Sequence, residues 1–388
     1  MSAERGTAVA VAADKQATPF RFYDNRQKYL AFVNTCNEKS AVARRAALEL
    51  KHARPTPPAL RIFDAGMGDA TVLSRLMRHA HSHGPTVPIM VVAKEISLED
   101  VRLGLEKMPD RFLEHPATVL VITNMNYSEA PRLMPRDIQA AAALNWHEVR
   151  LKGQTSHEYS EQIEELATTL AFGWQTKPSP RTGNPVYVRP SVLVVYREDH
   201  KFLLDRVIPK PGQTFESYDL IIASQPWRAR MSARFKAQRV LAPLVRSLAP
   251  NGRLLVIQSY GRDPALEIIQ RLWPDENPFQ VDRRQLLAAL KTELGREASE
   301  FSLTAPADDK AIFRYEMHTL PNEIGDRIGT STLFAAWNAA IYVNQIEDER
   351  LDKVVTTDAY LEATQSILQK HGGLWFNDET FVVSRRHK

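Results

Sequence analysis

Short apolar runs recur along the first two thirds of the chain, and each ends on glycine or polar residues. A run that is apolar at nearly every position is typical of a strand buried on both faces of a parallel sheet. The segments between the runs include stretches with the apolar spacing of an amphipathic helix. The runs lie at 60–63, 87–96, 118–123, 218–223 and 253–257. This pattern predicts an α/β fold, doubly wound around a mostly parallel sheet.

The segment Leu60–Leu73 combines a strand, a glycine turn and the start of a helix. Its apolar run reaches Asp64, Gly66 and Gly68 follow with one residue between them, and a helix is expected from Ala70. Glycines this close let the backbone approach a ligand that a Cβ would push away, and the helix presents free N–H groups at the same point. The segment predicts the opening of a nucleotide-binding sheet, with a plain strand-to-helix turn as the alternative.

Polar residues follow the ends of the next runs. Glu95 lies at the end of the second run, Asn126 follows the third, and Ser224 follows the fourth. Because the carboxyl ends of parallel strands meet at one edge of the sheet, we expect these side chains to face a ligand. A carboxylate at the position of Glu95 accepts the ribose hydroxyls in nucleotide-binding sheets. Asn126 either pairs its amide with an adenine edge or forms an Asx turn.

The spacing of the runs divides the chain into five parts. A parallel βα repeat does not need the long stretch between the third and fourth runs, so this stretch is expected to be an inserted cap or substrate subdomain. The aromatic residues before the first run either form a lid or pack in the core. The expected parts are a flexible tail (1–19), an N-terminal helical lid (20–58), the two halves of a cofactor-binding domain (59–131, and 218–388 with C-terminal helical additions) and the cap (132–217).

Composition narrows the class of protein. The single cysteine, Cys36, excludes an internal disulfide and a thiolate zinc cluster, and we expect no metal. No apolar run approaches the roughly 20 residues of a membrane helix, so a cytoplasmic protein without membrane insertion is expected. The net charge is +4 with a pI near 9.0, but basic and acidic residues are interleaved. This charge favours a solvated surface, and a nucleic-acid partner stays open.

The ordered motifs at five strand ends resemble those of the class I S-adenosylmethionine-dependent methyltransferases. The resemblance spans residues 60–261 without the cap, and the last strand resembles the reversed strand that closes such sheets. It implies a seven-stranded, Rossmann-like sheet and a transferase. The matching positions are Asp64-x-Gly66-x-Gly68, Glu95, Asn126 where the family usually has Asp, Tyr218–Trp227, Pro250–Leu255 and the last strand Phe381–Ser384. Thr71, where dinucleotide folds often keep a small residue, argues against NAD.

The resemblance implies S-adenosyl-L-methionine as the cofactor and gives each motif a role. The backbone of Gly66 and Gly68 would hold the methionine moiety and Glu95 the ribose. Asp64 would orient the glycine loop or bind the ammonium group. Three further residues would form the adenine site, with two apolar side chains on either side of the ring and an amide at its edge: Ile96, Met125 and Asn126. Asp69 is a further cofactor candidate, with capping of the following helix as the structural alternative.

The fourth motif suggests the catalytic residues. Ser224-Gln225-Pro226-Trp227 resembles the Asn/Asp/Ser-Pro-Pro-aromatic tip of amino-group methyltransferases, in which oxygen atoms accept from the target nitrogen and the ring stacks on it. The implied catalytic residues are Ser224, Gln225 and Trp227. The implied function is methyl transfer to a small or medium-sized acceptor, with an amino nitrogen as one candidate. Two alternatives are an RNA methyltransferase, suggested by basic residues at 228–239, and a non-catalytic cofactor-binding regulator.

Overall fold

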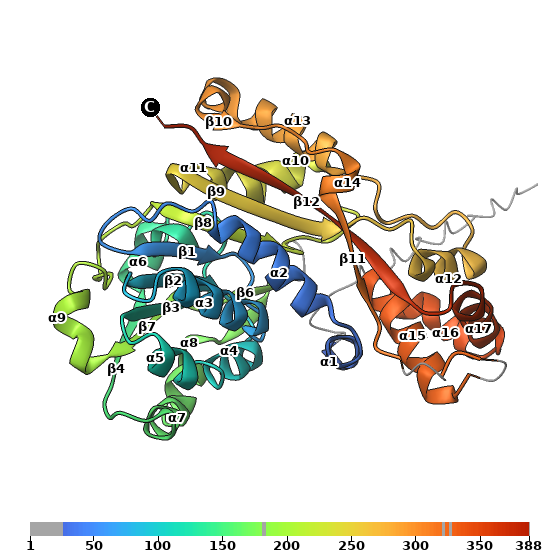
Figure 1. Ribbon diagram of the computed structural model, residues 1–388, viewed down its shortest axis with the longest axis horizontal. Helices are drawn as coiled ribbons and strands as arrows, with labels where there is room; N and C mark the ends of the chain where they lie inside the picture. Colours follow the sequence, from blue (N-terminus) through green and yellow to red (C-terminus); the bar gives the residue numbers. More distant parts are fainter. Residues whose placement is uncertain (1–25, 181–183, 320–322, 326–327, 388) are drawn as a thin grey trace, which may run out of the picture.

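A mostly parallel sheet runs through the computed structural model, which is described for residues 26–180, 184–319, 323–325 and 328–387 (Figure 1). Five parallel strands lie in the order β3–β2–β1–β8–β9. The chain therefore moves outward in one direction from β1 to β3 and in the other from β8 to β9. These strands are β1 (Leu60–Asp64), β2 (Ile89–Lys94), β3 (Thr118–Thr123), β8 (Tyr218–Ser224) and β9 (Leu248–Ser259).

The reversed last strand is β12 (Trp375–Arg385), which pairs antiparallel with β9. On its other side it pairs with β10 (Phe301–Ser302) and β11 (Ile312–Glu316). The predicted α/β fold class, with a mostly parallel sheet and a reversed last strand, is thus confirmed. β12 is longer than the predicted strand, and its first residues lie beyond the end of β9, where they pair with β11 beside the helical part of the molecule (Figure 1).

The predicted number of seven strands is wrong, because the described part of the chain forms a sheet of ten. Two of the extra strands come from the segment 132–217. These are β7 (Ser191–Arg197), antiparallel to β3, and β4 (Asn145–Leu151), parallel to β7. Every residue of β7 is buried, because the strand lies inside the extended sheet between β3 and β4. The same segment forms a hairpin from β5 (Thr176–Pro178) and β6 (Pro185–Tyr187).

Helices cover both faces of the sheet, as a doubly wound fold requires. Neighbouring residues of a strand enter opposite cores, as Ile62 and Phe63 do in β1. One face packs against α2 (Glu38–Leu50), α3 (Thr71–His83), α4 (Leu98–Leu105), α5 (Pro109–Glu114), α7 (Ser156–Glu164) and α8 (Ala167–Gly173). The other packs against α9 (Lys201–Leu204), α10 (Ala233–Lys236), the π-helical turn Ala237–Leu241, α11 (Ala242–Arg246) and α13 (Arg283–Leu294). Two short helices, α6 (Ile138–Ala142) and α14 (Asp308–Ala311), complete this part.

A third core lies at the far end of β12, where helices from both ends of the chain meet. Phe32 of α1 packs there against Tyr315 of β11 and Phe376 of β12. The helices are α1 (Arg26–Thr35), α12 (Pro264–Leu272), α15 (Thr330–Val343), α16 (Asp348–Val355) and α17 (Ala359–His371). The predicted tail (1–19) and the first residues of the predicted lid lie outside the described residues. The division into domains stays a prediction.

Candidate functional site

A pocket lies where β1, β8 and β9 end, which is where the strand order reverses. Ligands of doubly wound sheets bind at this point. The pocket holds about 780 Å³ of empty space, counting the part open to solvent. Its floor is the loop after β1, and its walls come from the ends of β8 and β9 and from α1, α2, β11 and α15.

The two glycines of the predicted motif serve different purposes. Gly66 lines the pocket, and a Cβ built on it would meet no atom within 4 Å. The space beside its backbone is therefore open to a ligand. Gly68 has a φ of +52°, a conformation that favours glycine, and a Cβ there would lie 3.4 Å from the Tyr29 hydroxyl. Gly66 thus makes room for a ligand, whereas Gly68 permits the turn.

Carboxylates fix this loop. Asp64 Oδ1 accepts a hydrogen bond from the Gly66 N–H at 3.1 Å. Burial raises the pKa of Asp64 from 3.8 to about 6, although the Gly66 N–H and Lys39 oppose the shift. Glu95 accepts from the Gly68 N–H at 2.8 Å and from two N–H groups that follow it in its own loop. In this structure Glu95 joins the loops after β1 and β2, while its predicted ribose contact stays a prediction.

The other residues predicted for the adenine site do not line the pocket. Met125 is fully buried in the core of the sheet. Asn126 is exposed, and its Oδ1 accepts from the N–H and hydroxyl of Ser128 at 2.9 and 2.7 Å. This is the Asx turn left open by the sequence. Ile96 is half-buried and contributes no surface to the pocket.

Tyr127, the residue after Asn126, spans the sheet edge next to the predicted adenine site. Its hydroxyl donates to the carbonyl oxygen of Pro226 at 2.9 Å, and its ring lies 5.0 Å from Lys94 Nζ. Because β1 and β2 lie between β3 and β8, the side chain reaches across the edge where β1 and β2 end. The sequence offered no signal for this contact, which joins residues 99 positions apart.

Asp69 has a structural role at the start of α3. Its carboxylate accepts from the backbone N–H and the hydroxyl of Thr71, at 3.2 and 2.6 Å. It lies 3.6 Å from Lys39 Nζ and 3.3 Å from Lys107 Nζ. Burial would raise the pKa of Asp69, but these cations and hydrogen bonds outweigh it, and the net shift is downward. Asp69 therefore stays ionised beside the glycine loop.

Sequence reasoning gave no individual role to the three polar pocket residues on the N-terminal helices, namely Tyr29, Glu38 and Lys39. Lys39 Nζ donates to the Tyr29 hydroxyl at 3.1 Å. Burial alone would lower the pKa of Lys39, but Tyr29, Glu38 and Asp69 raise it, so the ammonium group stays charged. Burial raises the pKa of Tyr29 to about 12. The predicted lid included these positions, yet only the fold shows that they face the glycine loop.

Two of the three predicted catalytic residues lie in the same pocket as Asp64 and Gly66. Ser224 lines it, and its hydroxyl makes no hydrogen bond within the described part of the chain. Gln225 also lines it and has a φ of +49°, a strained conformation for a residue other than glycine. Its Oε1 accepts from the N–H and hydroxyl of Ser259, and its Nε2 donates to Asp378 Oδ1 at 3.2 Å. The amide of Gln225 is thus already engaged by the fold.

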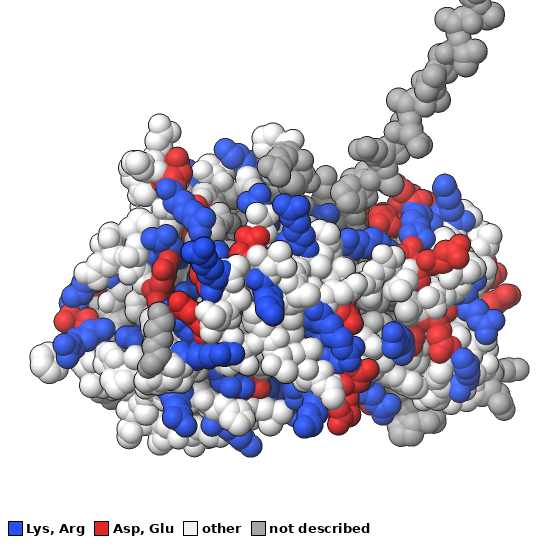
Figure 2. Space-filling view, turned by 90° about the horizontal axis from the view of Figure 1, so that it is seen from above, with Lys and Arg blue, Asp and Glu red and all other residues white. Residues whose placement is uncertain are grey.

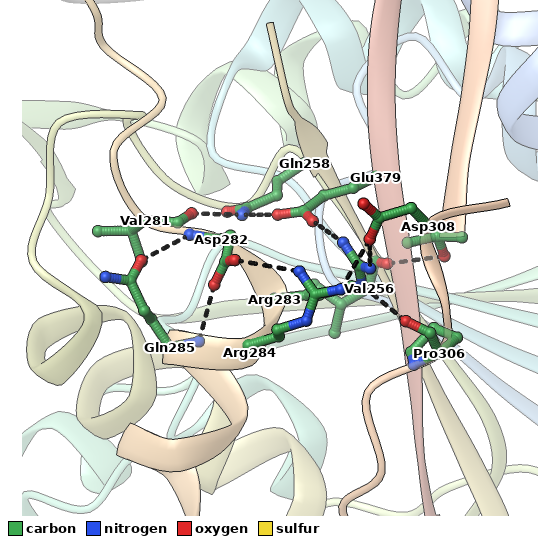
Figure 3. A network of polar contacts seen from close by, with 11 residues as sticks. Val256, Gln258, Val281, Asp282, Arg283, Arg284, Gln285, Pro306, Asp308 and Glu379 are labelled. Carbon is green, nitrogen blue, oxygen red and sulfur yellow. Dashed lines mark hydrogen bonds and ion pairs between the residues drawn. The ribbon is translucent and has the colours of Figure 1, made fainter. Parts of the chain in front are cut away.

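Trp227 is directed away from this pocket. It is buried, and its Nε1 donates to Gln258 Oε1 at 2.9 Å. Gln258 in turn donates to Glu379 of β12 at 2.7 Å. Glu379 accepts at 3.0 Å from Arg283, which is fully buried at the start of α13 and also pairs with Asp308 (Figure 3). Trp227 contributes to a network that joins α13 to the sheet, and its predicted catalytic role stays a prediction.

The predicted basic cluster at 228–239 is largely bonded within the fold. Arg230 donates to the carbonyl oxygens of Asn344 and Gln345 and pairs with Glu276. Lys236 is buried and donates to the carbonyl oxygen of Ala229. Figure 2 shows that basic side chains on one face of the molecule are interspersed with acidic ones. Arg228, Arg230 and Lys236 are thus bonded within the fold, whereas Arg234 and Arg239 are exposed.

The described residues contain neither a metal site nor a membrane-spanning helix. No group of three or more histidine, cysteine or acidic side chains there could hold a metal ion. In the same part of the chain, no helix is long and apolar enough to cross a membrane.

Comparisons with known proteins concern the fold. No protein-family model and no curated protein matches the chain. It is similar to a solved geranyl diphosphate methyltransferase in complex with GPP and sinefungin, with 12% identity over 88% of this chain and 78% of that chain and a TM-score of 0.31. It is also similar to phosphoethanolamine N-methyltransferase 2 of Haemonchus contortus in complex with S-adenosyl-L-methionine. The identity is 12% over 96% of this chain and 61% of that chain, and the TM-score is 0.33. A third similar structure is StiE O-MT, with 11% identity over 96% of this chain and 84% of that chain and a TM-score of 0.34. At these TM-scores the likeness assigns no activity.

The buried pair Arg283–Glu379 yields a stability prediction. Arg283→Met should lower the free energy of unfolding by about 3–5 kcal/mol, because it leaves the Glu379 carboxylate buried without its cation. Arg284→Met is the matched control, since Arg284 is the exposed neighbour on the same helix and should change stability by less than about 1 kcal/mol. Urea unfolding measures both variants. Equal effects of the two substitutions would contradict this role of Arg283.

Proposed function

We propose that the chain is a class I S-adenosylmethionine-dependent methyltransferase that acts on a small or medium-sized acceptor at an amino nitrogen. The observation that carries the proposal is that a single pocket at the sheet edge combines the glycine-loop residues Asp64 and Gly66 with Ser224 and Gln225. Cofactor and acceptor must meet in line for methyl transfer, so the residues for both have to share one space. The fold and the sequence resemblance support this assignment.

The residues at the glycine loop fit the amino-acid end of the cofactor. The open space beside Gly66 would hold the amino-acid tail of S-adenosylmethionine. The charged Lys39 would bind its carboxylate, and Asp64 its ammonium group. Glu95, Ile96, Met125 and Asn126 remain the proposed partners of the adenosine end, which requires that Tyr127 leave Pro226. When bound, the cofactor supplies an electrophilic methyl group with a neutral thioether as leaving group.

The chain's own contribution is alignment and the exclusion of water. Within the described residues the hydroxyl of Ser224 makes no hydrogen bond, so its oxygen would accept one from the target nitrogen. Gln225 would act through its strained backbone, because its amide already bonds Ser259 and Asp378. Helices α1, α2 and α15 would shield the reacting groups from solvent. The intramolecular bonds of the basic cluster do not favour the RNA alternative.

Cofactor binding tests the glycine-loop assignment. Calorimetry should show that the protein binds S-adenosylmethionine and S-adenosylhomocysteine but not NAD. Gly66→Val should weaken binding by about 100-fold or more, because its side chain would fill the space beside the loop. Gly373→Val is the matched control, since a Cβ there also meets no atom within 4 Å but lies outside the pocket. Undiminished binding by Gly66→Val would refute the assignment.

The pKa of Asp64 predicts a pH dependence. A folded-state pKa of about 6 lies above that of the unfolded chain, so the ionised carboxylate costs stability at neutral pH and protonation below pH 6 removes that cost. A cationic ligand group is attracted only to the ionised form. Affinity for S-adenosylhomocysteine should therefore fall by about 10-fold from pH 7.5 to pH 5. Asp64→Asn should bind weakly at both values; a pH dependence unchanged in this variant would exclude Asp64 as its source.

Turnover separates an enzyme from a non-catalytic cofactor-binding regulator. The protein should convert labelled S-adenosylmethionine to S-adenosylhomocysteine when it is given a pool of small amines. Ser224→Ala should lower kcat by about 10-fold or more while leaving S-adenosylhomocysteine affinity within about 2-fold, because the hydroxyl would contact only the acceptor. Tight cofactor binding without turnover on any acceptor pool would favour the regulator.

A further inference from the structure

The pocket wall formed by α1, β11 and α15 is aromatic. The rings of Phe32 and Tyr342 lie 5.1 Å apart, those of Phe32 and Tyr315 lie 6.0 Å apart, and those of Tyr29 and Tyr342 lie 5.9 Å apart. All four side chains line the pocket, although they come from distant parts of the sequence. Aromatic faces gathered around a pocket attract a cation through their quadrupoles.

Glu38 adds an acidic side chain to this wall. It is the first residue of α2, lines the pocket, and makes no hydrogen bond or ion pair within 4 Å in the described part of the chain. Its neighbour Lys39 is directed instead toward Tyr29 and Asp69. Burial raises the pKa of Glu38, and Lys39 only partly opposes the shift. A half-buried carboxylate without a hydrogen-bonded partner carries a desolvation cost that a cationic ligand would relieve.

A second acid lies behind the same wall. Asp378 is fully buried, and its Oδ1 accepts from the pocket residue Gln225. Its Oδ2 has no hydrogen-bond partner within the described residues. Burial, followed by the charges of Glu38 and Asp263, raises its pKa well above the usual range. This shift favours the protonated, uncharged form of Asp378, so Glu38 is the acidic side chain left to meet a cation, because Asp69 matches the charge of Lys39.

We infer that Glu38, Phe32, Tyr315 and Tyr342 form a subsite for an organic ammonium ion, and that the methyl acceptor is a small aliphatic amine which enters as this cation. The inference deepens the proposed function and rests on it. Neutral acceptors such as alcohols lack the charge that the carboxylate and the rings would hold.

The subsite also accounts for the proton that an ammonium acceptor must lose. The Glu38 carboxylate takes one proton from the ammonium group and becomes a carboxylic acid. The freed lone pair of the nitrogen then forms the new N–C bond, while the electron pair of the breaking S–C bond stays on sulfur. The products are an N-methylammonium ion, a neutral thioether and the proton held by Glu38, which solvent later removes. Charge and atoms balance without a further reactant.

A matched pair of probes tests the subsite. Choline carries a trimethylammonium group, and 3,3-dimethyl-1-butanol is its uncharged carbon isostere. The full-length protein saturated with S-adenosylhomocysteine should bind choline at least about 10-fold more tightly than the isostere, as measured by calorimetry. Glu38→Gln and Tyr342→Leu should each weaken choline binding by about 10-fold or more. Arg44→Gln is the control, because Arg44 is an exposed residue of the same helix outside the pocket.

Three further outcomes are decisive. Glu38→Gln should keep or raise the Tm, since it removes a charge without a hydrogen-bonded partner; a lower Tm would mark a structural role and overturn the inference. Equal affinities for choline and its isostere would also overturn it. Absence of S-adenosylhomocysteine binding would refute the proposed function instead, and choline binding to the protein alone would then still test the subsite.

Discussion

The structure of the site depends on carboxylates that bind the backbone of the glycine loop. Asp64 and Glu95, at the ends of two adjacent parallel strands, accept hydrogen bonds from Gly66, Gly68 and the loop after β2. N–H groups at a sheet edge have no partners within the sheet, so these bonds satisfy them and hold the turn in shape. The space beside Gly66 is thereby present without a ligand, and a ligand that enters it need not first order the loop.

The rest of the pocket is built by segments that are distant in sequence. α1 and α2 place Tyr29, Glu38 and Lys39 over the glycine loop. The long β12 carries the third core away from the sheet and brings α15 and β11 to the other side of the pocket (Figure 1). The same strand holds Asp378 behind the pocket and Glu379 in the buried network with Arg283. One strand thus contributes both to the stability of the sheet and to the shape of the pocket.

The sequence predicts those features that depend on local pattern. Buried parallel strands are apolar throughout, so β1, β2, β3 and β8 could be placed within a few residues, and the glycine loop followed from the spacing of Gly66 and Gly68. The strand β4 could not be assigned to the sheet, because its residues are mostly half-exposed and its partner β7 lies 40 or more residues away. The position of a residue in a motif also does not determine its side-chain contacts. The fold directs Trp227 to Gln258 and away from the pocket, and it directs Tyr127 to Pro226. Glu38 and Lys39 stand in no motif, and their role depends on how α2 packs against the sheet.

The most direct test of the account is a crystal structure of the protein with S-adenosylhomocysteine. The account predicts that the amino-acid tail lies beside Gly66 between Asp64 and Lys39, and that Tyr127 has left Pro226 to admit the adenosine above the ends of β1 and β2. A ligand bound elsewhere, with the Tyr127–Pro226 hydrogen bond intact and the space beside Gly66 filled only by solvent, would contradict it.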